Sequence, residues 1–345
     1  MLLMLAEVLQ LCSVSTAVPD SSFWRFLCEH QSHVPWVGCS LHDLIQPGFS
    51  FLVGVALPFS IANRQARGQG FRTMASHAAV RVLALVILGV LLQSVGPRRI
   101  IWEFVDTLTQ IGLAYYFVFL LAFRSTRICW IALWVLLFGY WLAFAIFPLP
   151  GTQFDYATVG VSSEWLQHHG LKGFAAHWQK NSHLAWAFDS WFLNLFPREE
   201  PYSGSQNGLT TLNFVPLIGT MILGLLAGRL LRSDGSAWSK VCRLGIAGVA
   251  GIAVGWGLGV IGVCPVVKAI WTPSWVLFSG GWCSLLLGAF CAIVDIGKQK
   301  SLVFPLVVVG MNSIAAYSIS KLYPAVAFNS LRRIAHDLTT ASLPL

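Results

Sequence analysis

Charged residues are scarce in this sequence. Asp, Glu, Lys and Arg make up 10% of its 345 residues, whereas an ordinary soluble domain carries about 25%. Hydrophobic residues make up 56%, and 15 Trp and 23 Phe are among them. The composition therefore excludes an ordinary soluble domain and predicts an integral membrane protein, with the lipid bilayer as a partner.

Acidic residues are fewer than basic ones, which gives a formal net charge of +8. The Lys and Arg residues are not gathered in one patch or interleaved with aromatics, as they would be on a nucleic-acid-binding surface. They lie between apolar runs, where they determine membrane topology. We therefore expect no nucleic acid among the partners.

The sequence also lacks the spacing of a metal site. Its eight cysteines form no CxxC pair, and its histidines show no ligand pattern, so we expect no metal. Most cysteines are expected to be small core hydrophobes, because they fall in or beside apolar runs. This set comprises Cys12, Cys129, Cys242, Cys283 and Cys291.

Long apolar runs recur along the chain, and a bilayer core of about 30 Å needs about 20 apolar residues per helix. The predicted fold is all-α, a polytopic transmembrane helix bundle of about nine spans. The runs are Met1–Val18, Leu41–Ala62, His77–Val95, Leu108–Phe123, Ile128–Phe147, Leu212–Leu231, Leu244–Val263, Trp275–Val294 and Leu302–Ile319. No basic segment precedes the first run, as it would in a signal peptide.

The connections between these runs differ in charge, and the difference predicts orientation. One alternate set is rich in Lys and Arg and contains the single acid Asp234, so we assign it to the cytoplasm. The other set contains many acids and lies outside, together with the loop that carries His33. Residues 148–210 belong to this outer set and are too long for an incidental connection, so we expect a small extracytoplasmic cap loop rich in Trp and His.

Glycine recurs every four residues in the seventh run, at Gly251, Gly255 and Gly259. Small residues at this spacing let a second helix approach closely. The partner helix lies either in the same bundle or in a second copy of the chain, which leaves a homodimer open.

Ionisable residues stand where the second apolar run begins. His33 and Trp36 precede it in the outer loop, with Trp36 at interfacial depth, and Asp43 lies about one turn inside it. In a functional interpretation, His33 is a nucleophile or general base and Asp43 holds its ring in one tautomer, provided that residues 35–40 fold back. In the alternative, Ser40 or Asp43 caps the helix and His33 is only solvated.

The order of residues from His33 to Gly54, H-x-x-W-x-G-x-x-x-x-D-L-x-x-P-x-F-x-F-x-x-G, resembles the heparan-α-glucosaminide N-acetyltransferase family and its bacterial relatives. Further segments resemble the family in the same order and cover most of the chain. They are DTLTQIGLAYYF from Asp106, GLTTLNFVPLIGTMILGLLAG from Gly208, KAIWTPSWVLFSGG from Lys268 and GMNSIAAYSIS from Gly310. The first motif and the Lys268 segment are the specific ones.

The resemblance implies a membrane-bound acyltransferase, in the inner membrane of a bacterium. It takes an acetyl group from cytoplasmic acetyl-CoA and passes it to an amino sugar or glycan outside, with His33 as the active-site residue. An imidazole suits acyl or proton transfer near neutral pH. Cytoplasmic Arg72, Arg124 and Arg229 are then candidates for the CoA phosphates, although topology alone would also explain them.

Other candidates for substrate binding are Glu7, Trp36, Lys268 and Asn312. Glu7 stands where the family has an asparagine, and Asn312 is a polar group at membrane depth that either lines a passage or bonds a neighbouring helix. The acidic segment that often precedes the sixth span in the family is replaced here by SGSQNGL, Ser203–Leu209. Acceptor chemistry is therefore open.

The expected organisation is a single transmembrane domain over residues 1–322, with a tail over 323–345. The resemblance implies further chain at both ends. A permease or sugar-binding transporter without covalent chemistry is the alternative function, although such proteins often show two matching halves and no internal repeat stands out. A structural or assembly protein is a third alternative.

Overall fold

The computed structural model describes residues 4, 9–95, 99–319 and 321–322, which form helices and a single isolated β-bridge. The α-helices are α2 (Leu11–Ala17), α3 (Ser22–Gln31), α4 (Ile45–Ala66), α5 (Phe71–Gln93), α6 (Thr107–Leu121), α7 (Thr126–Ile146), α8 (Ser163–His169), α9 (Leu184–Phe192), α10 (Phe214–Arg232), α11 (Ala237–Val260), α12 (Pro273–Cys291) and α13 (Lys300–Met311). Short helical turns join them, among them η2 (His42–Leu44).

Six helices of the described part are long and apolar enough to cross a membrane. They are α4 with η2, α5, α7, α10 with the turn before it, α11, and α12 with the π-helical turn Ala292–Ile296. The number of nine predicted from the sequence is not confirmed. Helix α6 has only 15 residues, α13 ends at Met311, and the run Met1–Val18 lies partly outside the described residues.

Helix α10 lies inside the bundle and carries several of its most buried side chains. Leu217, Met221 and Leu225 are fully buried there, against α4, α6, α7 and α12. Glycines allow the closest crossing: a Cβ on Gly54 of α4 would collide with the carbonyl oxygen of Met221, and one on Gly224 with that of Phe51. These two positions bring the α4 and α10 backbones into contact.

Helices α11 and α12 pack on each other through their small residues. A Cβ on Gly251 would lie 2.8 Å from the Leu277 carbonyl oxygen, and one on Gly255 would lie 2.6 Å from that of Ser274. The sequence left open whether these glycines face a helix of the same bundle or a second copy of the chain. In the structure, Gly251 and Gly255 face α12 of the same chain.

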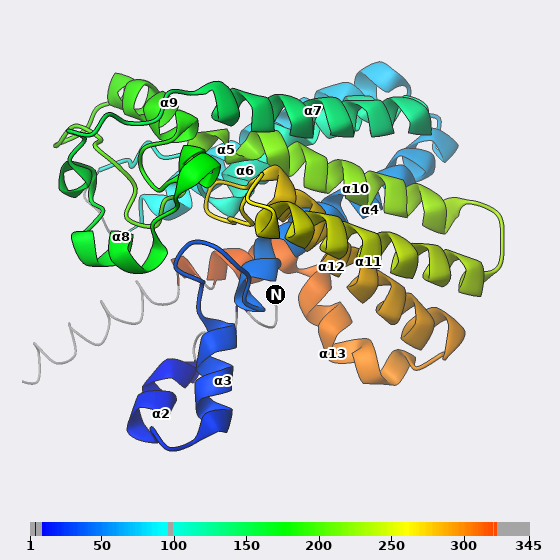
Figure 1. Ribbon diagram of the computed structural model, residues 1–345. Helices are drawn as coiled ribbons and strands as arrows, with labels where there is room; N and C mark the ends of the chain where they lie inside the picture. The colour runs from blue at the N-terminus through cyan, green and yellow to red at the C-terminus, as the bar shows by residue number, and fades with distance from the viewer. Residues whose placement is uncertain (1–3, 5–8, 96–98, 320, 323–345) are drawn as a thin grey trace, which may run out of the picture.

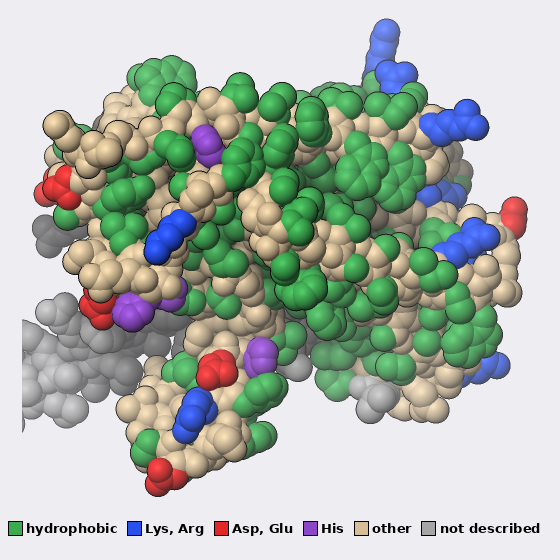
Figure 2. Space-filling model, in the orientation of Figure 1, with side chains coloured by type: hydrophobic (Ala, Val, Ile, Leu, Met, Phe, Trp, Pro, Cys, Tyr) green, Lys and Arg blue, Asp and Glu red, His purple; other side chains and the backbone are tan. Residues whose placement is uncertain are grey.

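The two ends of the bundle differ in charge. Figure 1 shows the connections α4–α5, α6–α7 and α10–α11 at one end, and Figure 2 shows Lys and Arg side chains concentrated there. Residues 147–210 fold at the opposite end, with α8, α9 and short 3₁₀ turns. Their fully buried Trp178 packs with Phe144 of α7 and with Trp36. Trp36 is thus buried in protein, with 2% of its surface exposed, and does not lie at a lipid interface.

Helices α2 and α3 form a hairpin that projects from the bundle beside this second end (Figure 1). A disulfide between Cys12 and Cys28 joins the two helices. The prediction that Cys12 is a small core hydrophobe was wrong, because residues 9–31 form a cross-linked peripheral hairpin and no part of the core. Cys129 and Cys283 are buried free thiols, as expected.

Candidate active site

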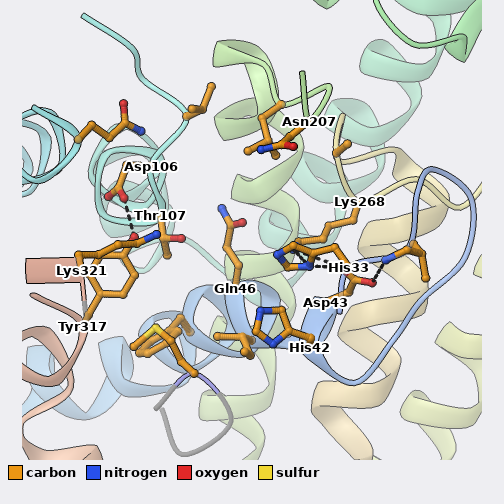
Figure 3. A pocket seen from close by; sticks show the side chains of 18 of the residues that line it. His33, His42, Asp43, Gln46, Asp106, Thr107, Asn207, Lys268, Tyr317 and Lys321 are labelled. Atoms are coloured by element: carbon orange, nitrogen blue, oxygen red, sulfur yellow. Dashed lines mark hydrogen bonds and ion pairs between the residues drawn. The ribbon is translucent and has the colours of Figure 1, made fainter. Parts of the chain in front are cut away.

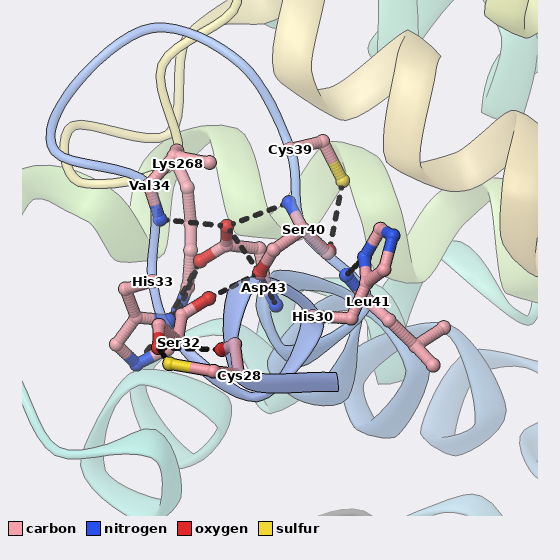
Figure 4. Close-up of polar contacts among 10 residues, drawn as sticks. All are labelled: Cys28, His30, Ser32, His33, Val34, Cys39, Ser40, Leu41, Asp43 and Lys268. Atoms are coloured by element: carbon pink, nitrogen blue, oxygen red, sulfur yellow. Dashed lines mark hydrogen bonds and ion pairs between the residues drawn. The ribbon is translucent and has the colours of Figure 1, made fainter. Parts of the chain in front are cut away.

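The loop after α3 folds back over the start of α4 and brings His33 to Asp43. The Nδ1 atom of His33 lies 2.7 Å from Oδ1 of Asp43 (Figure 4). A carboxylate has no proton to give, so a hydrogen bond between these two atoms requires the ring proton on Nδ1, with the lone pair then on Nε2. The His33 side chain keeps 57% of its surface exposed, whereas Asp43 keeps 1%. The ring is therefore accessible and its partner is not.

The turn that folds the loop back depends on Gly38. Its φ of +120° lies in a region that L side chains rarely adopt. The Gly38 amide donates to the carbonyl oxygen of Val266 at 3.0 Å, and Val37 forms an antiparallel bridge with Val267. The Trp36 indole donates to the Trp178 carbonyl oxygen at 3.1 Å. The loop is thus held by the segment before α12 and by residues 147–210.

Buried Asp43 is surrounded by donors. Its Oδ2 atom accepts from the amide of Val34 at 3.3 Å and from the amide of Ser40 at 3.0 Å, and the Ser40 hydroxyl also lies at 3.0 Å. A buried carboxylate is costly unless such donors and a counter-charge satisfy it. Asp43 thus organises the loop and also holds His33. The Asp43 amide donates to the Ser40 hydroxyl at 3.3 Å, as the capping alternative expected of Ser40, but the part of that alternative in which His33 is only solvated does not fit the contact with Asp43.

Lys268 supplies the counter-charge. Its Nζ atom lies 3.2 Å from Asp43 Oδ1, and 3.0 and 3.5 Å from Nδ1 and Nε2 of His33. An ammonium only donates, so with the ring proton on Nδ1 its acceptors are the Asp43 carboxylate and the Nε2 lone pair. The side chain is 13% exposed and comes from the loop between α11 and α12. That loop is fixed by the Thr272 hydroxyl, which donates to the Pro265 carbonyl oxygen at 2.8 Å. Lys268 was expected only as a substrate-binding candidate, and the structure makes it the third member of the His33–Asp43 cluster.

The cluster lies on one side of a cavity of about 600 Å³ between α4, α5, the start of α6 and residues 207–209 (Figure 3). The ring of His42 packs edge-on against His33, with 4.5 Å between ring centres. The side chains of Gln46 and Asn207 point into the cavity (Figure 3). Gln46 follows Asp43 by three residues, so helical spacing alone indicates that the two share a face.

A second polar pair lies across the cavity from His33. The Tyr317 hydroxyl donates to Asp106 Oδ2 at 2.5 Å, and Asp106 Oδ1 accepts from the Leu108 amide at 2.8 Å as the N-cap of α6. Lys321 also lines this side. The pairing was not predicted from the sequence, because the two residues are 211 positions apart, although each lies in a segment that resembles the family.

One nucleophile near the site is excluded by its surroundings. Burial, followed by the negative charge of Asp43, raises the pKa of the Cys39 thiol to about 12. Cys39 therefore stays protonated near neutral pH, and a thiol in that form is a weak nucleophile. His33 remains the accessible nucleophile or base of this loop.

The predicted phosphate-binding arginines lie at the basic end and differ in their contacts. Arg229 donates to the carbonyl oxygens of Leu121, Ala122 and Arg124 at 3.3, 2.9 and 2.7 Å, so its guanidinium caps the end of α6. Arg72 and Arg124 are exposed. The contacts of Arg229 favour a structural role over a phosphate site.

One further candidate, Asn312, is not brought to the cavity. Asn312 follows α13, is exposed, and donates to the Val308 carbonyl oxygen at 3.4 Å, which favours bonding within its own segment over lining a passage. Glu7 lies outside the described residues. Trp36 does line the cavity, as Lys268 does. Among the described residues, no three His, Cys, Asp or Glu side chains are grouped as a metal ion would require.

The fold and the site define a multi-helix membrane protein with an exposed histidine, a buried carboxylate and a lysine at a cavity. No protein-family model matches the chain. The chain is similar to the human heparan-alpha-glucosaminide N-acetyltransferase, with 25% identity over 340 residues, 86% of this chain and 48% of the relative. It thus spans about half the length of the curated relative it matches. The similarity indicates a distant relationship to a transferase and agrees with the motif from His33 to Gly54.

Proposed function

We propose that the protein transfers an acetyl group from cytoplasmic acetyl-CoA across the membrane to an amino sugar or glycan on the other side. The observation that carries the proposal is the cluster of His33, Asp43 and Lys268 beside a cavity of about 600 Å³. The name of the human relative supports acetyl transfer to an amine.

We assign a part to each member of the cluster, in agreement with its contacts. With its Nδ1 proton donated to Asp43, His33 offers the Nε2 lone pair as base or nucleophile. Asp43 holds the tautomer and stabilises the imidazolium that forms when Nε2 takes a proton or the acetyl group. Lys268 balances the charge of Asp43, and its ammonium lies close enough to attract the oxyanion that develops on the thioester carbonyl.

The transfer balances as follows. The amine nitrogen of the acceptor forms a bond with the thioester carbonyl carbon, either directly or after His33 Nε2 has first taken the acetyl group. The bond between that carbon and the CoA sulfur breaks, and CoA leaves as a thiolate that keeps the electron pair of the bond. In the route through His33, the bond between Nε2 and the acetyl carbon breaks in a second step, when the amine attacks, and Nε2 regains its lone pair. The proton lost by the amine passes to His33 and then to solvent or to the departing thiolate.

Two observations support the orientation with His33 outside. The Lys- and Arg-rich end of the bundle, opposite the site, is the expected cytoplasmic end. The disulfide between Cys12 and Cys28 lies in the hairpin that leads to His33, and disulfides persist in oxidising compartments. Residues 147–210 then form an extracytoplasmic cap. The full proposal retains about nine spans, one domain over residues 1–322, and a bacterial inner membrane.

The donor must approach from the basic end, where the exposed side chains of Arg72 and Arg124 can hold phosphate groups. The thioester must then reach the cavity beside α4, α5 and α6. We make no such assignment for Arg229, whose donors are used by the α6 carbonyl groups.

Inverted membrane vesicles carrying the protein test the proposal, because their basic end faces the medium. With radiolabelled acetyl-CoA outside and glucosamine inside, we expect labelled N-acetylglucosamine in the lumen. A panel of other amines, including amino acids and galactosamine, defines the acceptor class. Release of unmodified glucosamine from the lumen into the medium, without labelled product, would favour the permease alternative and contradict the proposal.

A further inference from the structure

A second cavity, of about 720 Å³, adjoins the first. The two share a wall formed by Val105, Asn207 and Leu209. The rest of the second cavity is lined by residues 99–103 and 197–206, which precede α6 and α10. The two cavities are therefore neighbours, with Asn207 between them.

The segment of residues 203–206, which lines the second cavity just before Asn207, is held in place by its backbone. The carbonyl oxygens of Ser203 and Ser205 accept from the Trp186 indole at 2.7 Å and from the Asn181 amide group at 2.9 Å. Lys180 donates to the carbonyl oxygen of Gln206. A surface fixed in this way loses little conformational entropy when a ligand binds to it.

The lining has the chemistry that binds sugars. Trp102 provides a flat aromatic side chain, and its ring stacks on Phe196 with 5.5 Å between centres. Ser205, Gln206 and Asn207 add hydroxyl and amide groups, which can donate to and accept from sugar hydroxyls. A fixed aromatic plane with neutral polar groups around it suits a pyranose ring.

The charges of the cavity argue against a sulfated ligand. Among the described lining residues, Arg99 lies 2.9 Å from Glu199 and Arg198 lies 3.3 Å from Glu103, so that each cation has an acidic partner. Glu200 adds a further negative charge. A sulfate binds best to cations whose hydrogen bonds are not already used, and the net charge of these five side chains is negative.

We propose that the second cavity binds the next sugar of an uncharged glycan chain whose terminal amino sugar occupies the first cavity. The inference rests on the proposed function and adds to it the class of acceptor. The preferred acceptor is then an unsulfated oligosaccharide with a terminal amino sugar, and neither a free monosaccharide nor a sulfated chain.

Three acceptors test the proposal with acetyl-CoA as donor. They are glucosamine, a disaccharide of glucosamine linked to N-acetylglucosamine, and the same disaccharide with one sulfate on its reducing sugar. We expect kcat/KM to be about tenfold higher for the neutral disaccharide than for glucosamine, as one stacked ring with its hydrogen bonds would give. For the sulfated disaccharide, kcat/KM should be lower than for the neutral disaccharide by about fivefold or more.

Variants connect this preference with the cavity. Trp102→Ala should bring the ratio of kcat/KM for the neutral disaccharide to kcat/KM for glucosamine close to one. Gln206→Ala should reduce this ratio about threefold, because it removes an exposed side chain and keeps the backbone contact of Gln206. Trp191→Ala is the matched control, because Trp191 is exposed on α9 and does not line the cavity. Glu200→Gln should reduce the difference in kcat/KM between the sulfated and the neutral disaccharide. Glu164→Gln should leave this difference unchanged, because Glu164 is exposed on α8 and does not line the cavity.

Equal kcat/KM for glucosamine and the neutral disaccharide, or a preference for the sulfated one, would overturn the inference and leave acetyl transfer intact. If no amine is acetylated, saturation-transfer NMR with the neutral disaccharide separates the two proposals. A signal on the reducing sugar that Trp102→Ala weakens would support the glycan site although the transfer reaction fails. Absence of binding would contradict the site.

Discussion

Lys268 Nζ lies 3.2 Å from the carboxylate of Asp43, although 225 positions separate the two residues in the sequence. The contact joins the loop before α12 to the start of α4, the two segments that carry the specific motifs. Because Asp43 is 1% exposed and Lys268 is 13% exposed, water screens this pair little. The pair therefore links the stability of the fold to the position of the His33 ring.

The pair can be tested by a double-mutant cycle. Lys268→Met should lower the free energy of unfolding by about 3 kcal/mol, because it leaves a buried carboxylate without its cation. Adding Asp43→Asn removes that charge, so the double variant should be more stable than the sum of the single effects predicts. Unfolding in mixed detergent and SDS measures all four proteins. Strictly additive effects would contradict the coupling.

Substitutions of the arginines at the basic end should have two different effects, one on the KM for acetyl-CoA and one on thermal stability. Arg72→Gln and Arg124→Gln should raise the apparent KM for acetyl-CoA about tenfold, as expected for a lost charged hydrogen bond, and leave folding unchanged. Arg229→Gln should mainly lower the thermal unfolding midpoint, because the α6 carbonyl groups lose their donor. Steady-state kinetics and melting curves distinguish these effects. A folded Arg229→Gln protein with a raised KM would reverse the assignment.

Topology can be tested by labelling single added cysteines in intact cells. We expect Thr152→Cys, an exposed position in residues 147–210, to react with an impermeant maleimide. Gln65→Cys, exposed at the basic end, should react only after the cells are permeabilised. The parent protein provides the background from its free cysteines. Labelling of Gln65→Cys alone in intact cells would invert the orientation.

The buried Asp189 in α9 should make stability depend on pH. Burial raises its pKa to about 6, so the folded protein holds this proton more tightly than the unfolded chain does. The stabilisation is complete below the ordinary pKa near 3.8 and is lost as pH rises through about 6. Asp189→Asn can still accept from the Thr211 amide, as Asp189 does at 2.9 Å.

Melting curves between pH 4 and 7 check this prediction. The parent should lose stability relative to Asp189→Asn over that window, and the difference should be largest at pH 7. Glu164→Gln serves as the control, because Glu164 is exposed on α8. Parallel curves for the parent and Asp189→Asn would show that Asp189 keeps an ordinary pKa.

The sequence predicted most of the long helices, because each apolar run is long and ends at charged or Gly- and Pro-rich connections. One of the two interpretations of the sequence required residues 35–40 to fold back and bring Asp43 to His33, and Pro35 and Gly38 favour such a turn. The structure has this contact, and the catalytic role of the two residues stays a prediction.

Contacts between distant segments could not be predicted in this way. Lys268 reaches His33 across 235 positions, and no spacing rule connects them. The same holds for Tyr317 with Asp106. Arg229 looked like a phosphate ligand because a sequence shows its charge and does not show the carbonyl oxygens of α6. Cys12 looked like a core residue because its neighbours in the sequence are apolar. A sequence does not show that these neighbours belong to a hairpin outside the bundle.

The rate of acetyl transfer by a His33→Ala variant shows whether the His33 ring carries the reaction. The account predicts a loss of about 10² to 10⁴ in rate, the usual contribution of a general base or nucleophile. Folded yield and acetyl-CoA binding should stay near those of the parent, because the His33 side chain is 57% exposed. His168→Ala, another exposed histidine at the same end, should keep the parent rate. A His33→Ala protein that acetylates an amino sugar at the parent rate would contradict the account.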